Sequence, residues 1–141
     1  MMTRDELWRR YVMEYGVEVS EEAIENERAF IELDLRHRMQ YDRLSGGGAH
    51  LFPGQELAEQ EDELLAAATF EAKEPIVVRE LASRLGLEVT PAELEAEART
   101  IADSQQTTVE ALRSFFGDDL TMLRRDVLER KAIDWAVAHS E

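Results

Sequence analysis

The sequence contains no cysteine, and this absence excludes both disulfide bonds and thiol chemistry. Glycine and proline are scarce, with 7 and 3 among 141 residues, and no window has the alternating pattern between turn signals that is typical of hairpins. No run approaches the roughly 18 consecutive apolar residues that a membrane-spanning helix requires. These absences favour a chain of helices that is interrupted only at its few glycines and prolines.

Basic residues are also in short supply. The 16 lysines and arginines are outnumbered by 31 aspartates and glutamates, so the formal net charge is −15. Such a charge repels phosphate backbones and anionic lipids, and we therefore expect neither nucleic acid nor a membrane as a partner. The apolar fraction of 44% is too high for a disordered acidic tail. Because residues 1–8 are polar and charged, unlike a signal peptide, we expect a cytoplasmic protein.

Apolar periodicity and capping signals predict six helical stretches. Thr90, Pro91 and Glu93 form a complete start signal, with a hydroxyl cap, a proline in the first turn and a glutamate that closes a capping box. Pro75 is expected to kink or break its helix near Glu74, because proline lacks the backbone donor of a helix interior. The stretches cover residues 4–15, 20–44, 55–85, 90–104, 107–116 and 118–139, with cap residues included.

An internal repeat relates two joints of the chain. Residues 16–27 align with residues 86–97 at a constant offset of 70, and 5 of the 12 positions are identical. Each copy reads as a helix end, a glycine, a short extended segment, a serine or threonine cap, and a new helix. The repeat is either a twofold duplication or the ordinary likeness of two helix–turn–helix joints.

The stretch 20–44 carries apolar residues on two faces. A helix on the surface of a compact domain needs only one apolar stripe. The extra stripe either packs against the chain or faces an open groove that accepts foreign apolar segments. At 100° per residue, the first stripe contains Ile24, Ile31, Leu35 and Met39, and the second stripe, roughly opposite, contains Ala23, Phe30, Leu33, Tyr41 and Leu44.

No pattern in the sequence suggests catalysis or metal binding. His37 falls on the second stripe and is expected to be partly buried, and neither His50 nor His139 adds a metal-ligand spacing to it. The adjacent pair Asp118-Asp119 is typical of a helix start rather than of a catalytic pair of carboxylates. We therefore expect no enzyme, no cofactor and no metal.

Three segments of the second half carry a resemblance to a known family. In order and spacing they resemble the C-terminal, client-binding domain of trigger factor, and residues 15–30 resemble an earlier joint of the same domain. A related helical chaperone domain occurs in some prolyl isomerases. The resemblance implies an all-α fold with protruding helical arms, as a single domain over residues 1–141 with duplicated joints at 15–30 and 85–100. The segments are Val77-Val-Arg-Glu-Leu-Ala-Ser-Arg-Leu-Gly-Leu-Glu-Val-Thr90, Thr107-Thr-Val-Glu-Ala-Leu-Arg-Ser-Phe-Phe-Gly117 and Leu123-Arg-Arg-Asp-Val-Leu-Glu-Arg-Lys-Ala-Ile-Asp-Trp-Ala-Val137.

The resemblance also implies an activity, which is ATP-independent binding of unfolded or nascent polypeptide. The Gly-Phe-Arg-x-Gly-Lys ribosome-docking signature and the prolyl-isomerase domain of the family are missing from this sequence, so neither ribosome contact nor isomerase activity is expected. The alternative is a structural or dimerisation module, a homodimer in which the second stripes cover each other. The candidate polypeptide contacts are Phe30, Leu33, Tyr41, Leu44, Leu51, Phe52, Met122, Ile133 and Val137.

Overall fold

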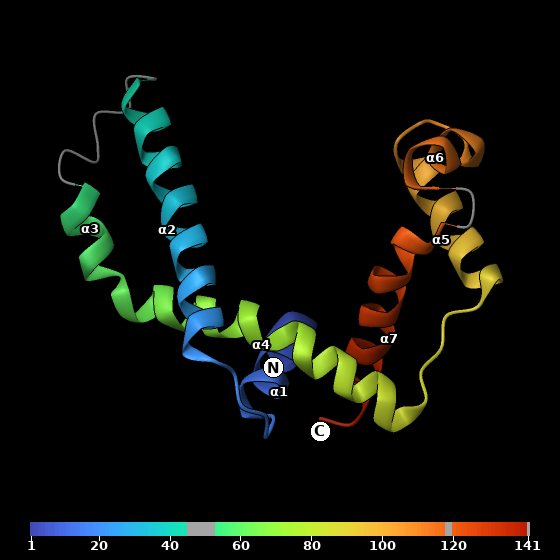
Figure 1. The fold of residues 1–141 in the computed structure, drawn as a ribbon, viewed down its shortest axis with the longest axis horizontal. Coiled ribbons are helices and arrows are strands. Elements are labelled where there is room, and N and C mark those ends of the chain that lie inside the picture. Colours follow the sequence, from blue (N-terminus) through green and yellow to red (C-terminus); the bar gives the residue numbers. More distant parts are fainter. Residues whose placement is uncertain (45–52, 118–119, 141) are drawn as a thin grey trace. The chain divides into compact units, whose positions relative to one another are not determined.

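The computed structural model describes residues 1–44, 53–117 and 120–140. Over these ranges the chain forms only helices and connecting turns, and 82% of the described residues are helical, which confirms the all-α expectation. In chain order (Figure 1) the elements are α1 (Arg4–Glu14), α2 (Glu21–Leu44), α3 (Pro53–Glu59), α4 (Glu61–Leu85), α5 (Pro91–Ser104), α6 (Val109–Phe116), the 3₁₀ helix η1 (Thr121–Leu123) and α7 (Arg124–Ala138).

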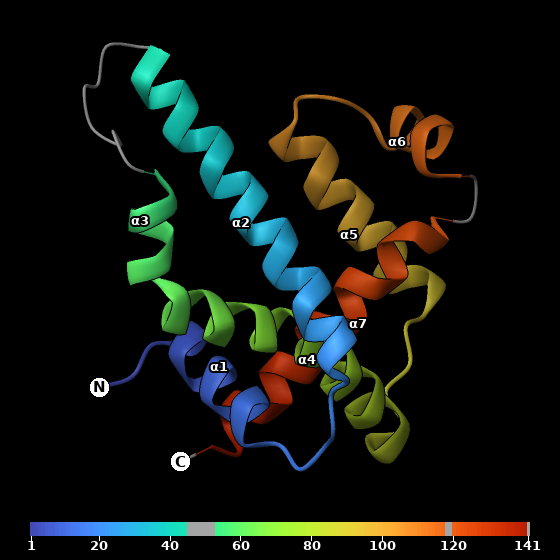
Figure 2. The ribbon, with the colours of Figure 1, turned by 60° about the vertical axis from the view of Figure 1, so that its left-hand side comes forward.

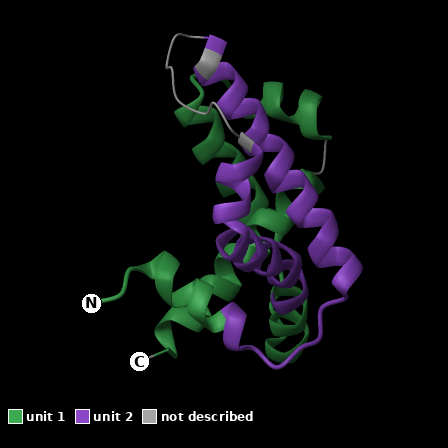
Figure 3. Cartoon of the chain, turned by 90° about the vertical axis from the view of Figure 1, so that its left-hand side faces the viewer, with its two compact units in different colours: residues 1–11, 78–141 green, residues 12–77 purple. Residues whose placement is uncertain are grey.

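The chain divides into two compact units, which Figure 3 shows in different colours. Unit 1 combines residues 1–11 with residues 78–141, and unit 2 comprises residues 12–77. The boundaries fall inside helices α1 and α4 rather than in loops. A single domain over residues 1–141 therefore stays a prediction.

Unit 2 has a small core beside helix α2. Helices α2 and α3 lie side by side in Figures 1 and 2, and the buried side chains Met39, Leu57 and Leu64 meet there. Ile31 and Leu35 are partly buried and pack against this cluster. The first stripe of α2 is thus its packed face. The helix begins where expected, because the Ser20 hydroxyl accepts a hydrogen bond of 3.1 Å from the Ala23 amide.

Unit 1 has a larger core around helix α5. Hydrogen bonds between Thr90 and Glu93 confirm the predicted capping box, with the Glu93 amide donating to the Thr90 hydroxyl at 3.2 Å and the Thr90 amide donating to the Glu93 carboxylate at 3.0 Å. Six buried side chains from α5, α6 and the segment before α7 form the core: Leu94, Ala98, Ala102, Leu112, Leu120 and Leu123.

The joint before α5 is tied to helix α7. The Lys131 ammonium lies 2.5 Å from a carboxylate oxygen of Glu93 and 2.5 Å from the carbonyl oxygen of Glu88. The hydrogen bond from Lys131, together with the Thr90 amide, lowers the pKa of Glu93. One lysine therefore holds both the extended segment and the first turn of α5.

Pro75 does not break its helix, so that part of the expectation is wrong, while a kink near Glu74 stays a prediction. Helix α4 continues from Glu61 to Leu85 with Pro75 inside it, and the interruption of the predicted stretch lies at Gln60 instead. A proline in a helix interior costs about 3 kcal/mol. Burial on both sides of the proline opposes this cost, because Leu64 and Val77 are buried and each large apolar side chain contributes about 1.5–3 kcal/mol.

The cap of helix α6 also differs from the prediction. The sequence pattern suggests Thr107 as the cap with Glu110 closing a box, but the Thr108 hydroxyl accepts the hydrogen bond, at 3.2 Å from the Ala111 amide. The third helical residue after this cap is alanine, so α6 starts with a simple cap. Gly117 ends the helix at a φ of 103°, as expected.

The two glycines of the repeat have different backbone conformations. Gly86 has a φ of +63°, and the Leu87 amide donates to the Ala82 carbonyl at 2.9 Å. This hydrogen bond is typical of a Schellman motif, in which a residue in the left-handed conformation ends a right-handed helix. Gly16, which also follows a helix end, is outside the left-handed region, so the two joints of the repeat do not share this cap. A side chain at Gly16 would meet nothing within 4 Å.

This difference gives a prediction for matched substitutions. Gly86→Ala should destabilise the chain by about 1 kcal/mol, because alanine is strained in the left-handed region. Gly16→Ala should be neutral or stabilising by up to about 1 kcal/mol, because it restricts only the unfolded chain. Urea unfolding followed by circular dichroism measures both. Equal losses would mean that the two joints share one backbone geometry.

Candidate polypeptide-binding surface

The second stripe of helix α2 is exposed. Its four large apolar side chains have exposed fractions of 77% for Phe30, 53% for Leu33, 71% for Tyr41 and 81% for Leu44. His37 is exposed among them, so the expectation that it is partly buried is wrong. The alternative in which helix α2 packs on both faces therefore does not hold for these side chains. We call the four exposed apolar side chains Phe30, Leu33, Tyr41 and Leu44 the α2 stripe.

Paired charges border the α2 stripe along the helix. On one flank Arg38 and Asp34 form an ion pair of 3.0 Å, and on the other flank Arg36 pairs with Glu32 at 3.1 Å. Such exposed pairs four residues apart add only about 0.3–0.5 kcal/mol to the helix. The ion pairs matter more for position than for stability, because they hold long charged side chains along the edges of the apolar surface.

Unit 1 also exposes two large apolar side chains on α6 and η1, one of which the sequence analysis missed. Phe115 on α6 is 80% exposed and Met122 in η1 is 66% exposed. The neighbouring Phe116 packs against the unit 1 core, and its ring lies 5.1 Å from that of Phe115 at a steep angle. A signal was available, since successive helical residues point 100° apart and two adjacent phenylalanines cannot both face one core.

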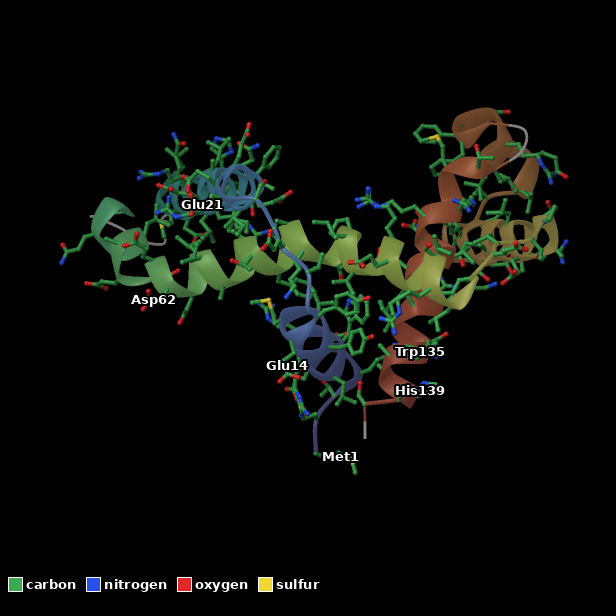
Figure 4. All side chains as sticks on the ribbon, turned by 60° about the horizontal axis from the view of Figure 1, so that its bottom comes forward. Met1, Glu14, Glu21, Asp62, Trp135 and His139 are labelled. Carbon is green, nitrogen blue, oxygen red and sulfur yellow. The ribbon has the colours of Figure 1, made fainter. Side chains whose placement is uncertain are left out.

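The remaining candidates differ in their exposure. Ile133 and Val137 on α7 are half-buried and therefore offer less surface than the α2 stripe. Near them, the Trp135 ring stacks on the His139 ring at 4.4 Å and contacts the Tyr11 ring edge-on at 6.2 Å. Figure 4 labels Trp135 and His139 toward the C-terminal end of α7. The predicted contacts Leu51 and Phe52 lie outside the described residues.

The described side chains form no group of histidine and carboxylate residues that could hold a metal ion. Among the helices within the described ranges, none has the length and hydropathy needed to cross a membrane. What the described surface offers is apolar area on helices, bordered by paired charges.

Comparison with known proteins identifies the family. The model of the C-terminus of bacterial trigger factor protein matches residues 2–138 of this chain. The chain belongs to the trigger factor C-terminal family. The match extends over both units and includes the α2 stripe, Phe115 and Met122.

A curated relative agrees with this family. The trigger factor of Carboxydothermus hydrogenoformans is 25% identical over 126 residues, which are 89% of this chain and 30% of that protein. The chain thus spans about a third of the length of the relative that it matches. No solved structure matches the chain. The C-terminal domain is the non-catalytic, chaperone part of trigger factor, so membership supports a chaperone-type role in general.

Proposed function

We propose that this trigger factor C-terminal domain binds unfolded or nascent polypeptide without ATP and thereby assists protein folding. The α2 stripe carries the proposal. Four large apolar side chains, each more than half exposed, share one helix face, and contiguous apolar patches on a protein surface commonly mark interaction sites. Family membership supports the same role, and the bacterial cytoplasm is the compartment that we propose for it.

The mechanism is reversible burial of apolar client side chains against the stripe. Burial of one large apolar side chain contributes about 1.5–3 kcal/mol, and association itself costs at least about 4 kcal/mol. Four side chains therefore give weak, reversible binding rather than a permanent complex. Because the hydrophobic effect is non-directional, such a surface accepts many sequences. Met122 would add a flexible contact, since methionine adapts to irregular partners.

The charge of the chain would select among clients. With a net charge of −15, it attracts basic segments and repels acidic ones, and this effect weakens with salt. The expected preference is for apolar segments that contain lysine or arginine. The net negative charge also limits aggregation of the chain through its own apolar surface.

An aggregation assay with a chemically denatured model client tests the proposal, run beside a measurement of molecular size. The chain should suppress light scattering near equimolar ratio, with no change on addition of ATP. A basic apolar peptide should compete better than an acidic peptide with the same apolar residues. If scattering is unaffected even at a large molar excess of the chain, client binding is wrong.

A further inference from the structure

His37 lies at the centre of the α2 stripe, both along the helix and around it. Leu33 and Tyr41 are four residues before and after it, and Phe30 and Leu44 are seven residues before and after it. At 100° per residue, these offsets place the first pair about 40° and the second pair about 20° to either side of the imidazole. All five side chains are exposed, so four apolar neighbours surround one titratable group.

A client that lies on the stripe therefore also covers His37. Contact with apolar side chains before and after this residue removes water from its imidazole. A neutral imidazole tolerates this loss far better than an imidazolium, because a charge is costly to bury unless it is paired. No described residue forms a hydrogen bond or an ion pair with His37. The charged form thus depends on water, and a client displaces that water.

The charges beside His37 on its own helix are already paired. Asp34, three residues before His37, lies 3.0 Å from a guanidinium nitrogen of Arg38. Arg36 directly precedes His37 and pairs with Glu32 at 3.1 Å. Each of these carboxylates is matched by an arginine, so neither is in surplus to balance a charge on His37.

The helices beside α2 pack on its other face. They meet it at the buried cluster that contains Met39, and Met39 points about 160° away from His37. The carboxylates of α3 and of the first turn of α4 therefore approach α2 from the side opposite to His37, where Glu61 lies 3.7 Å from Arg28. These carboxylates are Glu56 and Glu59 on α3 and Glu61, Asp62 and Glu63 on α4.

We propose that His37 determines which clients the α2 stripe binds and makes their affinity depend on pH. This inference rests on the proposed function. Imidazole exchanges its proton between about pH 5 and pH 8, a range in which ordinary carboxylates and lysines keep their charge. Since coverage by a client favours the neutral imidazole, client binding releases the proton from a protonated His37. Affinity is therefore highest at the alkaline end of this range and decreases as the pH falls.

The charge on His37 also changes which clients are bound. A wholly apolar client offers nothing to an imidazolium and loses affinity in acid. A client with a carboxylate among its apolar residues can pair with the imidazolium, and a paired charge costs less to bury. The net charge of −15 still repels acidic clients. The carboxylate therefore reduces the loss of affinity in acid and does not make acidic clients preferred.

Fluorescence anisotropy of a labelled peptide tests the proposal. The peptide consists of leucine, phenylalanine and glutamine, has blocked ends and carries a label of constant charge, so only the protein titrates. At constant ionic strength, the dissociation constant of the unchanged chain should increase about tenfold between about pH 8 and pH 5.5, a typical size for a titration that burial disfavours.

Two variants assign this effect to one residue. His37→Gln should have the same dissociation constant at both pH values, because glutamine is polar but does not titrate. His139→Gln is the matched control, since it makes the same change at an exposed histidine of unit 1 and should keep the tenfold difference. A second peptide, with glutamate in place of its central glutamine, should lose less affinity in acid than the neutral peptide.

Several outcomes would overturn the proposal. Equal affinity of the unchanged chain at both pH values would exclude the role of His37 and leave client binding intact. A tenfold loss that persists in His37→Gln would assign the pH dependence to another group, and equal losses for both peptides would exclude the imidazolium charge as its cause. Absence of peptide binding at the alkaline pH contradicts the proposal too, and the aggregation assay then shows whether the proposed function fails with it.

Discussion

Replacement of Phe30 and Leu33 by serine should abolish suppression of client aggregation and leave the thermal stability of the chain nearly unchanged. Both side chains are more than half exposed, so their truncation removes few packed contacts, and surface substitutions of this kind usually change stability by about 0.5 kcal/mol or less. The same change removes half of the large apolar side chains of the α2 stripe. Light scattering of the client and a thermal melt of the variant measure the two effects separately.

Ile31 and Leu35 are the matched controls on the same helix. They pack against Met39, Leu57 and Leu64, so Ile31→Ser and Leu35→Ser should lower the melting temperature, whereas their effect on client binding follows only from unfolding. If Phe30→Ser and Leu33→Ser destabilise the chain as much as these controls do, the α2 stripe is part of a core. The proposed binding surface would then be reduced to Phe115 and Met122.

Leu120→Ala should destabilise unit 1 more than Leu120→Gly, which reverses the usual order. Leu120 is 2% exposed in the unit 1 core and has a φ of +59°, a conformation that favours glycine. Either substitution removes the buried side chain, at a cost of about 2–5 kcal/mol. Glycine relieves the backbone strain and alanine does not, so we expect the glycine variant to be less destabilised by about 1 kcal/mol.

Leu123 is the control for this reversal. It is 3% exposed in the same core, but its φ is −86°, so alanine should be tolerated better than glycine there, as at ordinary positions. Urea midpoints of the four variants settle the comparison. If alanine is the milder substitution at both leucines, Leu120 does not adopt the left-handed conformation in solution.

The predicted fold agrees with the structure where the determinants are local in sequence. The capping box at Thr90 and the stop at Gly117 follow from a few neighbouring residues and are confirmed. Pro75 shows the limit, because its outcome depends on whether the flanking side chains are buried. Glu110 favours Thr107 as the cap in the sequence, but the structure uses the hydroxyl of Thr108, so the path of the chain decides between the two threonines.

The sequence likewise predicts only part of the candidate surface. Periodicity separates the two faces of α2 but does not name the partner of either, so the exposure of Phe30 required the structure. The same holds for His37, whose burial depends on what lies opposite. Phe115 was overlooked although its neighbour Phe116 gave the signal. Whether any of these residues contacts a client stays a prediction.

The small core beside α2 has a dynamic consequence. Free energies of local opening follow the number of buried contacts that break. Among the described residues, the α2 cluster has three buried side chains and the α5 cluster has six. Backbone amides of α2 should therefore exchange with deuterium sooner than those of α5. Each such opening also uncovers Ile31 and Leu35, so the apolar area that α2 presents fluctuates with time, and the exposed stripe is its minimum.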